Sequence, residues 1–359
     1  MRTRLKPGRA SLVTLLLAVL TAVAAGSLAR AAPAAADVAA APSPKPATEA
    51  QWERIVAAAK REGEVTIYSS QNPIYLADFA KKFQERYDIR VTVNRQIDSV
   101  LVQQLTAEHG AGKVNADVYI TATKAHILGA QQAQNRWAVD AVGPALFAAG
   151  YNRSIFAKPG KAAIVGINVN CIGWNTSQWS TRIRDFPDVL NDRLKGRVGV
   201  IAPSAFSIID FYRWIEENYG RNYLSRLAAL EPKIYPSALP MTQAIASGEI
   251  TVGIFAATSA FDLKQQGAPI DCVIAKGDKT WNISWQGIVL RRAPHPNAAQ
   301  LVFNYMLTKE GQSLVQKRLG SPIKGVPNTF YVVPRQQNLK ESTAEKVAAY
   351  QKQWDGLFR

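Results

Sequence analysis

The chain has 359 residues, of which 47% are hydrophobic and 19% are charged, and its formal net charge is +16. This is the composition of a globular protein rather than of a disordered or fibrous one. The lysines and arginines form no cluster interleaved with aromatic residues, which argues against binding to nucleic acid. The basic balance then indicates either an anionic ligand or a dispersed solvated surface.

The first 31 residues have the features of a secretory signal peptide. A basic start is followed by an apolar run from Leu12 to Ala25 and a small-x-small cleavage pattern at Ala29 to Ala31. The apolar run is too short and too rich in Ala and Gly for a membrane anchor. The first cysteine is Cys171, so no lipid can be attached near the cleavage site. We therefore expect a periplasmic protein, with residues 32–48 as a disordered leader.

The size of the mature chain indicates two domains. Removal of 31 residues from 359 leaves 328, which is too many for one ordinary core. The removed segment holds five basic and no acidic residues, so the mature chain keeps a charge of about +11.

The stretch from Glu62 to Val93 is typical of a strand, a polar loop, an amphipathic helix and a second strand. Ser69, Ser70 and Gln71 stand where the first strand ends. In open α/β sheets, ligands bind beyond the carboxyl ends of the strands, where backbone amides and helix amino termini are exposed. The alternative is an ordinary solvated turn, since Ser favours turns anyway.

Similar polar corners recur along the chain. Asp98 and Ser99 follow the second strand, and Thr121 follows a third strand that ends at Ile120. Three such corners in register on one sheet line a cleft, because the carboxyl ends of parallel strands meet at one edge. A second α/β region repeats the pattern, with candidate binding residues at Ser204, Ala205, Ser207, Ser237 and Thr258.

The sequence offers little to an enzyme or to a metal. It contains no GxSxG, HExxH or CxxC motif, and none of its three histidines lies in a corner. His109 and His126 stand at helical positions without cysteines or carboxylates at metal-ligand spacing. Asp98 is a single carboxylate, which is weak support for acid catalysis. We expect a protein without catalytic residues, cofactor or metal.

Most of the mature chain resembles a known family. The segments EGEVTIYSS, ADVYI, FPDVLNDRLKGRVGVIAP, ASGEITVGI and APHPNAAQLVFNYMLTKEGQ resemble, in this order, the iron-type branch of the periplasmic solute-binding proteins of ABC transporters. The resemblance implies an α/β fold of the type II periplasmic-binding-protein class, in which two lobes with mixed sheets are joined by a two-strand hinge. It places the first lobe at 49–170 and 273–359 and the second at 171–272. The implied crossings are Val169 to Gly173 and Asp271 to Ile274, with the carboxyl-terminal helices on the first lobe.

The match departs from the ferric-binding members at the ligand positions. Those members carry adjacent tyrosines after the strand that here reads ITVGIF, and a histidine in the first corner. This chain has Ala256, Ala257 and Thr258 at the first place and Ser69 to Gln71 at the second. Hydroxyls and backbone amides suit a carboxylate, a phosphonate, a phosphate or a neutral polar solute rather than ferric ion.

Cys171 and Cys272 each fall in one implied crossing strand. Cysteines of exported proteins are normally paired, which predicts a disulfide across the hinge. Two unpaired core cysteines remain the alternative, because the sequence does not give the separation of the two residues.

These observations predict a monomeric substrate-binding component of an ABC importer, whose partners are a small anionic or polar solute and a membrane permease. Two alternatives are a ferric-ion-binding protein of an iron importer and a ligand-sensing module for a membrane receptor. Closure would follow from ligand contacts that are satisfied in both lobes only in the closed form.

Overall fold

The computed structural model describes residues 45–71, 73–96, 98–131, 137–157, 161–335 and 343–359. The predicted signal peptide and residues 32–44 of the predicted leader lie outside these ranges. Residues 45–48 of the predicted leader lie inside them, and there Ala47 donates its backbone N–H to the carbonyl of Val142 at 3.0 Å. No helix in the described ranges is long and apolar enough to cross a membrane.

A sheet of parallel strands opens the fold. β1 (Glu64–Ser69) pairs in parallel with β2 (Arg90–Arg95) on one side and with β3 (Val118–Thr121) on the other. Because the three strands run in one direction, their carboxyl ends meet at one edge of the sheet. The helices of this part are α1 (Glu49–Glu62), α2 (Pro73–Tyr87), α3 (Asp98–Gly110) and α4 (Lys124–Gln131).

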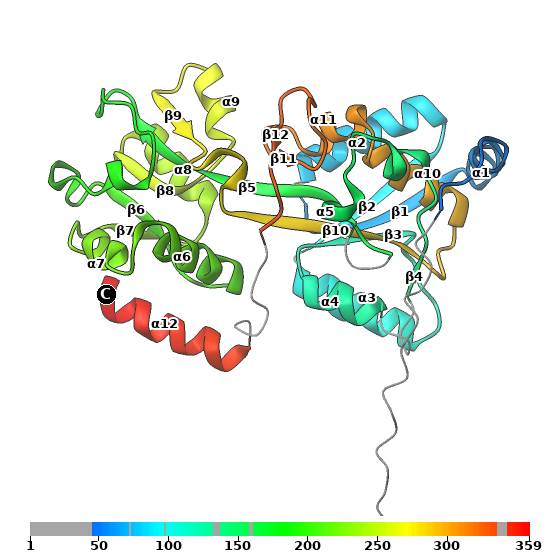
Figure 1. Cartoon of the computed structure of the whole chain (residues 1–359), viewed down its shortest axis with the longest axis horizontal. Helices are drawn as coiled ribbons and strands as arrows, with labels where there is room; N and C mark the ends of the chain where they lie inside the picture. Colours follow the sequence, from blue (N-terminus) through cyan, green and yellow to red (C-terminus); the bar gives the residue numbers. More distant parts are fainter. Residues whose placement is uncertain (1–44, 72, 97, 132–136, 158–160, 336–342) are drawn as a thin grey trace, which may run out of the picture. The chain divides into compact units, whose positions relative to one another are not determined.

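One long strand connects this sheet to a second set of strands (Figure 1). β5 (Ala163–Asn175) pairs over its first part with the antiparallel β10 (Asn282–Leu290), which also pairs with β3. Its second part pairs with β8 (Val252–Ala257) and β9 (Ile270–Val273). β8 continues in parallel to β6 (Val198–Ile201), and β6 to β7 (Lys233–Tyr235). The full order is β2-β1-β3-β10-β5-β8-β6-β7, which is a mixed α/β fold.

The remaining elements cover these strands. In the second set they are α6 (Phe206–Tyr219), α7 (Tyr223–Ala228), α8 (Ala238–Ser247) and α9 (Ala260–Gln265), with short 3-10 turns at Phe186–Val189, Asp192–Leu194 and Gly277–Lys279. The others are β4 (Ala138–Val139), a 3-10 turn at Pro144–Phe147, α5 (Arg153–Phe156), α10 (Pro296–Met306), α11 (Lys309–Val315), β11 (Gly320–Ser321), β12 (Phe330–Tyr331) and α12 (Ala344–Phe358).

Two large hydrophobic cores are separate in composition. The first core includes Ile67, Phe79, Val165 and Phe303, and the second core includes Trp174, Val200, Phe211 and Ile254. A smaller cluster with Tyr68 and Tyr119 covers the other face of the first sheet. Neighbouring residues Ile67 and Tyr68 enter different clusters because successive side chains of a strand point to opposite faces.

The return from the second core differs from the expected crossing at Asp271 to Ile274. β9 pairs only with the second part of β5, and Cys272, Ala275 and Trp281 are all buried in the second core. The chain pairs with the first part of β5 only from Asn282 onward. The predicted crossing is therefore several residues early, because a short apolar strand within a core and a crossing strand have the same local pattern.

The last helix also differs from the expectation that the carboxyl-terminal helices pack on the first lobe. α12 contacts α6 and α7 (Figure 1), and Trp354 is buried in the second core. The Trp354 ring lies 5.9 Å from that of Tyr212, and Gln351 donates its Nε2 to the carbonyl of Pro203 at 2.8 Å. By contrast, α10 and α11 belong to the first core, as expected.

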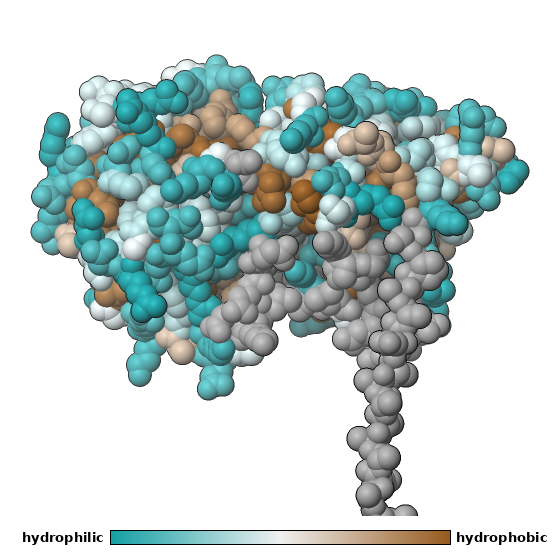
Figure 2. All heavy atoms as spheres, in the orientation of Figure 1, coloured by the Kyte–Doolittle hydropathy of each residue, from teal (hydrophilic) through white to brown (hydrophobic). Residues whose placement is uncertain are grey.

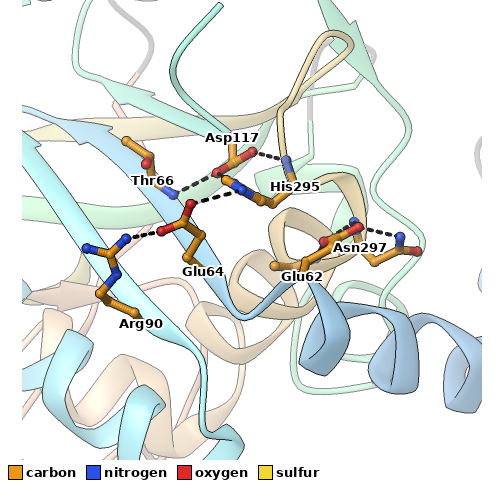
Figure 3. A network of polar contacts seen from close by, with 8 residues as sticks. Glu62, Glu64, Thr66, Arg90, Asp117, His295 and Asn297 are labelled. Atoms are coloured by element: carbon orange, nitrogen blue, oxygen red, sulfur yellow. Dashed lines mark hydrogen bonds and ion pairs between the residues drawn. The ribbon is translucent and has the colours of Figure 1, made fainter.

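A polar network holds the amino ends of the parallel strands (Figure 3). The buried Asp117 accepts hydrogen bonds from the backbone N–H groups of Thr66 and His295, each at 2.7 Å. The His295 ring lies between two carboxylates, with Nδ1 3.0 Å from Asp117 and Nε2 3.3 Å from Glu64, which also pairs with Arg90. The network fixes one end of the sheet, and the corners lie at the other.

Candidate functional site

The corners at the carboxyl ends of β1, β2 and β3 are residues 69–71, residues 95, 96 and 98, and residues 121–124. We call them the first corner set. At the first of them Ser69 is fully buried, and its Oγ accepts from the Gln71 backbone N–H at 3.2 Å. Gln71 is only 2% exposed. Its Nε2, like the Oγ of Ser70, is buried without a hydrogen-bond partner in the described part of the chain. Such atoms are costly unless a ligand or water satisfies them.

Asp98 organises the third corner of this set. Its carboxylate accepts from the Thr121 hydroxyl at 2.8 Å, from the Ala122 N–H at 3.4 Å and from the Thr123 hydroxyl at 3.3 Å. It therefore joins the start of α3 to the end of β3. Ser99 lies in the first turn of the same helix. The sequence-predicted residues Ser69, Ser70, Gln71 and Thr121 are thus at adjacent strand ends.

Two cations belong to the first corner set and were not predicted. Arg95 ends β2 beside Ser69 in the strand register, and its Nε donates to the Gln71 carbonyl at 3.3 Å. Lys124 begins α4 directly after the third corner. Among the described residues no carboxylate oxygen lies within 4.0 Å of either side-chain nitrogen group. Unpaired cations of this kind suit an anionic partner.

Gln286 is a further polar residue that the sequence did not reveal. It stands opposite Thr121 in the pairing of β10 with β3, and its Oε1 is buried without a partner in the described ranges. His126 lies near by, with Nδ1 3.0 Å from the hydroxyl of Tyr119. Burial lowers the pKa of His126, so it favours the neutral form. The sequence reveals neither the place of Gln286 nor the lowered pKa of His126, because the first depends on strand register and the second on burial.

The second corner set comprises residues 202–207, 236–238 and 257–259, at the ends of β6, β7 and β8. Hydrogen bonds connect these corners to neighbouring elements. The Ala202 N–H donates to the carbonyl of Tyr235 at the end of β7 at 2.9 Å, and the Ala257 N–H donates to the hydroxyl of Thr242 in α8 at 2.8 Å. Ser204, Ala205 and Ser237 are exposed, Ser207 is half-buried and Thr258 is buried. The neighbouring Ser259 Oγ is buried with no partner in the described chain.

The helices that begin at the second corner set lack a side-chain acceptor at their amino ends. α6 and α8 follow Ala205 and Ser237, and neither side chain accepts from the first turn. Elsewhere, α1 and α12 are capped by Thr48 and Thr343, and the Glu62 carboxylate accepts from the first turn of α10. The N-cap side chains of α6 and α8 thus accept no hydrogen bond from the first turn, as is also the case for α7 and α9. A helix amino terminus in this state favours an anionic acceptor.

Two helices that follow corners, α2 in the first set and α9 in the second, lie near each other. Burial raises the pKa of Tyr75 in the first turn of α2, and the charge of Asp262 in α9 raises it further. Asp262 is also paired with Arg318, whose Nε lies 3.3 Å from its carboxylate.

The ferric-type ligands are missing at this place. Ala256 is buried at the end of β8, and no group of three or more His, Cys, Asp or Glu that would hold a metal occurs in the described residues. The expected bond between Cys171 of β5 and Cys272 of β9 is confirmed, with the Cα atoms 5.8 Å apart. Its expected place between two crossing strands is wrong, because β9 pairs only with the second part of β5. Both cysteines lie in the second core.

Solved structures with the same fold bind different solutes. The iron-bound HitA of Pseudomonas aeruginosa matches with a TM-score of 0.62 at 17% identity, over 81% of this chain and 99% of that one. The substrate-binding protein of an ABC transporter of Agrobacterium tumefaciens has a TM-score of 0.64 at 16% identity, over 82% and 95%. AfuA of Actinobacillus pleuropneumoniae, with bound fructose-6-phosphate, has a TM-score of 0.58 at 20% identity, over 82% and 98%. These likenesses confirm the expected fold of periplasmic binding proteins.

Sequence comparison identifies the family. An uncharacterized protein of Haemophilus influenzae is 24% identical over 291 residues, which are 76% of this chain and 80% of that protein. The sequence pattern of the bacterial extracellular solute-binding proteins matches residues 65–318, including most corners of both sets and the strand β5 between them. The chain therefore belongs to the family of bacterial extracellular solute-binding proteins.

Proposed function

We propose that the protein reversibly binds a small anionic solute in the periplasm and delivers it to the permease of an ABC importer. The observation that carries the anionic assignment is that the starts of α6 and α8, both in the second corner set, lack a side-chain acceptor. The start of α7 also lacks one but lies outside the corner sets. The cations Arg95 and Lys124 support it from the first corner set. The protein makes and breaks no bond in the solute and acts as a monomer.

Binding is coupled to closure of two lobes. In this proposal the first lobe holds the first core and the second lobe holds the second core, with α12 on the second lobe. An anion that touches the first corner set and the amino ends of α6 and α8 gains its full set of hydrogen bonds only when both lobes reach it. The solute then shifts the equilibrium toward the closed form by its differential affinity.

Ala205→Asp tests the assignment. A carboxylate at this helix start accepts the first-turn N–H groups of α6 and repels an anionic solute, so the variant stays folded and loses binding. Asn222→Asp is the matched control, because it adds the same charge at the exposed, uncapped start of α7. The readout is the thermal shift of the mature protein with phosphate, sulfate, carboxylates, phosphonates, neutral sugars, amines and ferric citrate.

We expect one anion class to stabilise the wild type and the control, by about 2.7 kcal/mol at 100 times the dissociation constant. Ala205→Asp should show no such shift. Stabilisation by sugars or amines alone, or equal anion responses in both variants, would overturn the assignment. A coloured stoichiometric complex with ferric citrate would instead support the ferric-ion alternative. A neighbouring gene for a receptor rather than for a permease would favour sensing over transport.

A further inference from the structure

Exposed apolar side chains gather where the helices leave the corners. The face in Figure 2 is mostly hydrophilic, with hydrophobic residues in small groups. In the described chain five large apolar side chains are exposed, and three of them are Ile74 at 67%, Leu239 at 54% and Val100 at 41%. Ile74 is the second residue of α2, Leu239 the second of α8 and Val100 the third of α3. All three helices begin at a corner.

This placement differs from that of scattered surface residues. Single exposed leucines or valines need no explanation in a soluble protein. A helix start is, however, a polar environment that favours acidic and hydroxyl side chains. Here three of five exposed residues share the first turn of corner helices, and both corner sets contribute. Of the other two, Val333 follows β12 and Leu357 lies in the last turn of α12.

The apolar side chains follow closely in sequence on the groups that suit an anion. α2 and α3 follow the neighbouring strands β1 and β2, whose ends place Ser69 opposite Arg95. Ile74 and Val100 therefore leave the same sheet edge as the Arg95 guanidinium and the unpartnered Nε2 of the buried Gln71. Leu239 is two residues beyond Ser237, the uncapped start of α8. Three polar corners are thus each followed, in the first turn of the next helix, by an exposed apolar side chain.

We propose that the solute is an organic anion with an apolar portion, such as a carboxylate or phosphonate that carries an alkyl or aryl group. The inference rests on the proposed function and specifies its substrate class. The anionic group lies at the corners, and the apolar portion covers Ile74, Val100 and Leu239. A bare inorganic anion or a sugar phosphate leaves these side chains in water and gains nothing from them.

The test is the affinity of the mature protein for straight-chain carboxylates from acetate to octanoate, measured by calorimetry. Each methylene that is buried against the apolar side chains should tighten binding about fourfold until the pocket is filled. In Ile74→Ser and Leu239→Ser the gain per methylene should shrink, so that octanoate loses more affinity than acetate does. Leu357→Ser is the control, because this residue is 40% exposed at the far end of α12.

Three results would overturn the inference. Acetate, phosphate and octanoate bound with one affinity would leave the proposed function intact and remove the apolar portion. Equal weakening of acetate and octanoate by the two variants would mean that the side chains meet each other on closure and not the solute. Failure of every anion, together with binding of a neutral or cationic solute, would remove the proposed function and this inference with it.

Discussion

Thr121 donates its hydroxyl to the carboxylate of Asp98, 2.8 Å away, and so ties the last residue of β3 to the first residue of α3. The same carboxylate accepts from Ala122 and Thr123. A single side chain therefore sets the path of the backbone between a strand end and the helix after it, at the edge where the first corner set lies.

Asp98→Ala should destabilise the fold. It leaves the buried Thr121 hydroxyl and its neighbours without their acceptor, and a lost hydrogen bond to a charged group costs about 1.5 to 3 kcal/mol. Urea unfolding followed by circular dichroism measures the free energy of unfolding. Asp78→Ala on the exposed face of α2 is the control and should stay within about 0.5 kcal/mol of wild type. Equal stability of the two variants would contradict the role of Asp98.

Reduction of the Cys171–Cys272 disulfide should lower the melting temperature with little change in solute affinity. The bond closes a loop with a sequence separation of 101 residues, and loss of such a cross-link costs about 2 to 5 kcal/mol. Both cysteines are buried in the second core, and Cys171 pairs with Ala256 beside the corner at 257–259. This strand pairing does not depend on the disulfide, so the binding groups keep their places. A Cys171→Ala/Cys272→Ala variant should melt at the reduced temperature with or without reductant. Two alkylated thiols in non-reduced periplasmic protein would show that the bond does not form.

Acid should destabilise the protein partly through His109. Burial lowers the pKa of this histidine to about 4, and the nearby charge of Arg292 acts in the same direction. The unfolded chain has the ordinary pKa of about 6.5, so between these two values the unfolded state binds the proton more readily than the folded state. The contribution to stability is therefore present above pH 6.5 and is lost as the pH falls toward 4.

His109→Phe isolates this effect. The His109 ring stacks on Trp137 with the centroids 4.1 Å apart, and a phenyl ring keeps a flat partner there without titrating. The free energy of unfolding, measured from pH 7.5 to 4.5, should fall less steeply in the variant than in the wild type. Parallel curves would assign the acid sensitivity to other groups.

Asp117→Ala should be among the most destabilising single changes. It removes the acceptor of two backbone N–H groups and one of the two carboxylates beside His295, all at a fully buried position. Each hydrogen bond lost from a backbone N–H to this buried carboxylate costs about 1.5 to 3 kcal/mol. Glu64→Ala removes the other, half-buried carboxylate and should cost far less, since exposed pairs contribute about 0 to 1 kcal/mol. Denaturant unfolding of both variants compares the two.

The sequence predicts those features of the fold that depend only on residues close together in the chain. Val65, Ile67 and Tyr68 alternate between two clusters, and this pattern already indicates a strand that ends at Ser69. Arg95 and Gln286 were missed because strand register alone places Arg95 beside Ser69 and Gln286 opposite Thr121. The docking of α12 was assigned to the wrong core because the contact of Trp354 with Tyr212 joins residues that are distant in sequence. The candidate site stays a prediction.

Because of the packing of α12, the first and the last helix of the described region belong to different hydrophobic cores. α1 contributes Ala59 to the first core, whereas α12 contributes Trp354 to the second. Fluorophores attached near Glu49 and Arg359 would therefore be on different lobes. If the lobes close on solute binding, the distance between the fluorophores changes, and with it the efficiency of their energy transfer. The native chain is in this respect already arranged as a reagentless optical biosensor, without circular permutation or insertion of a reporter into a loop.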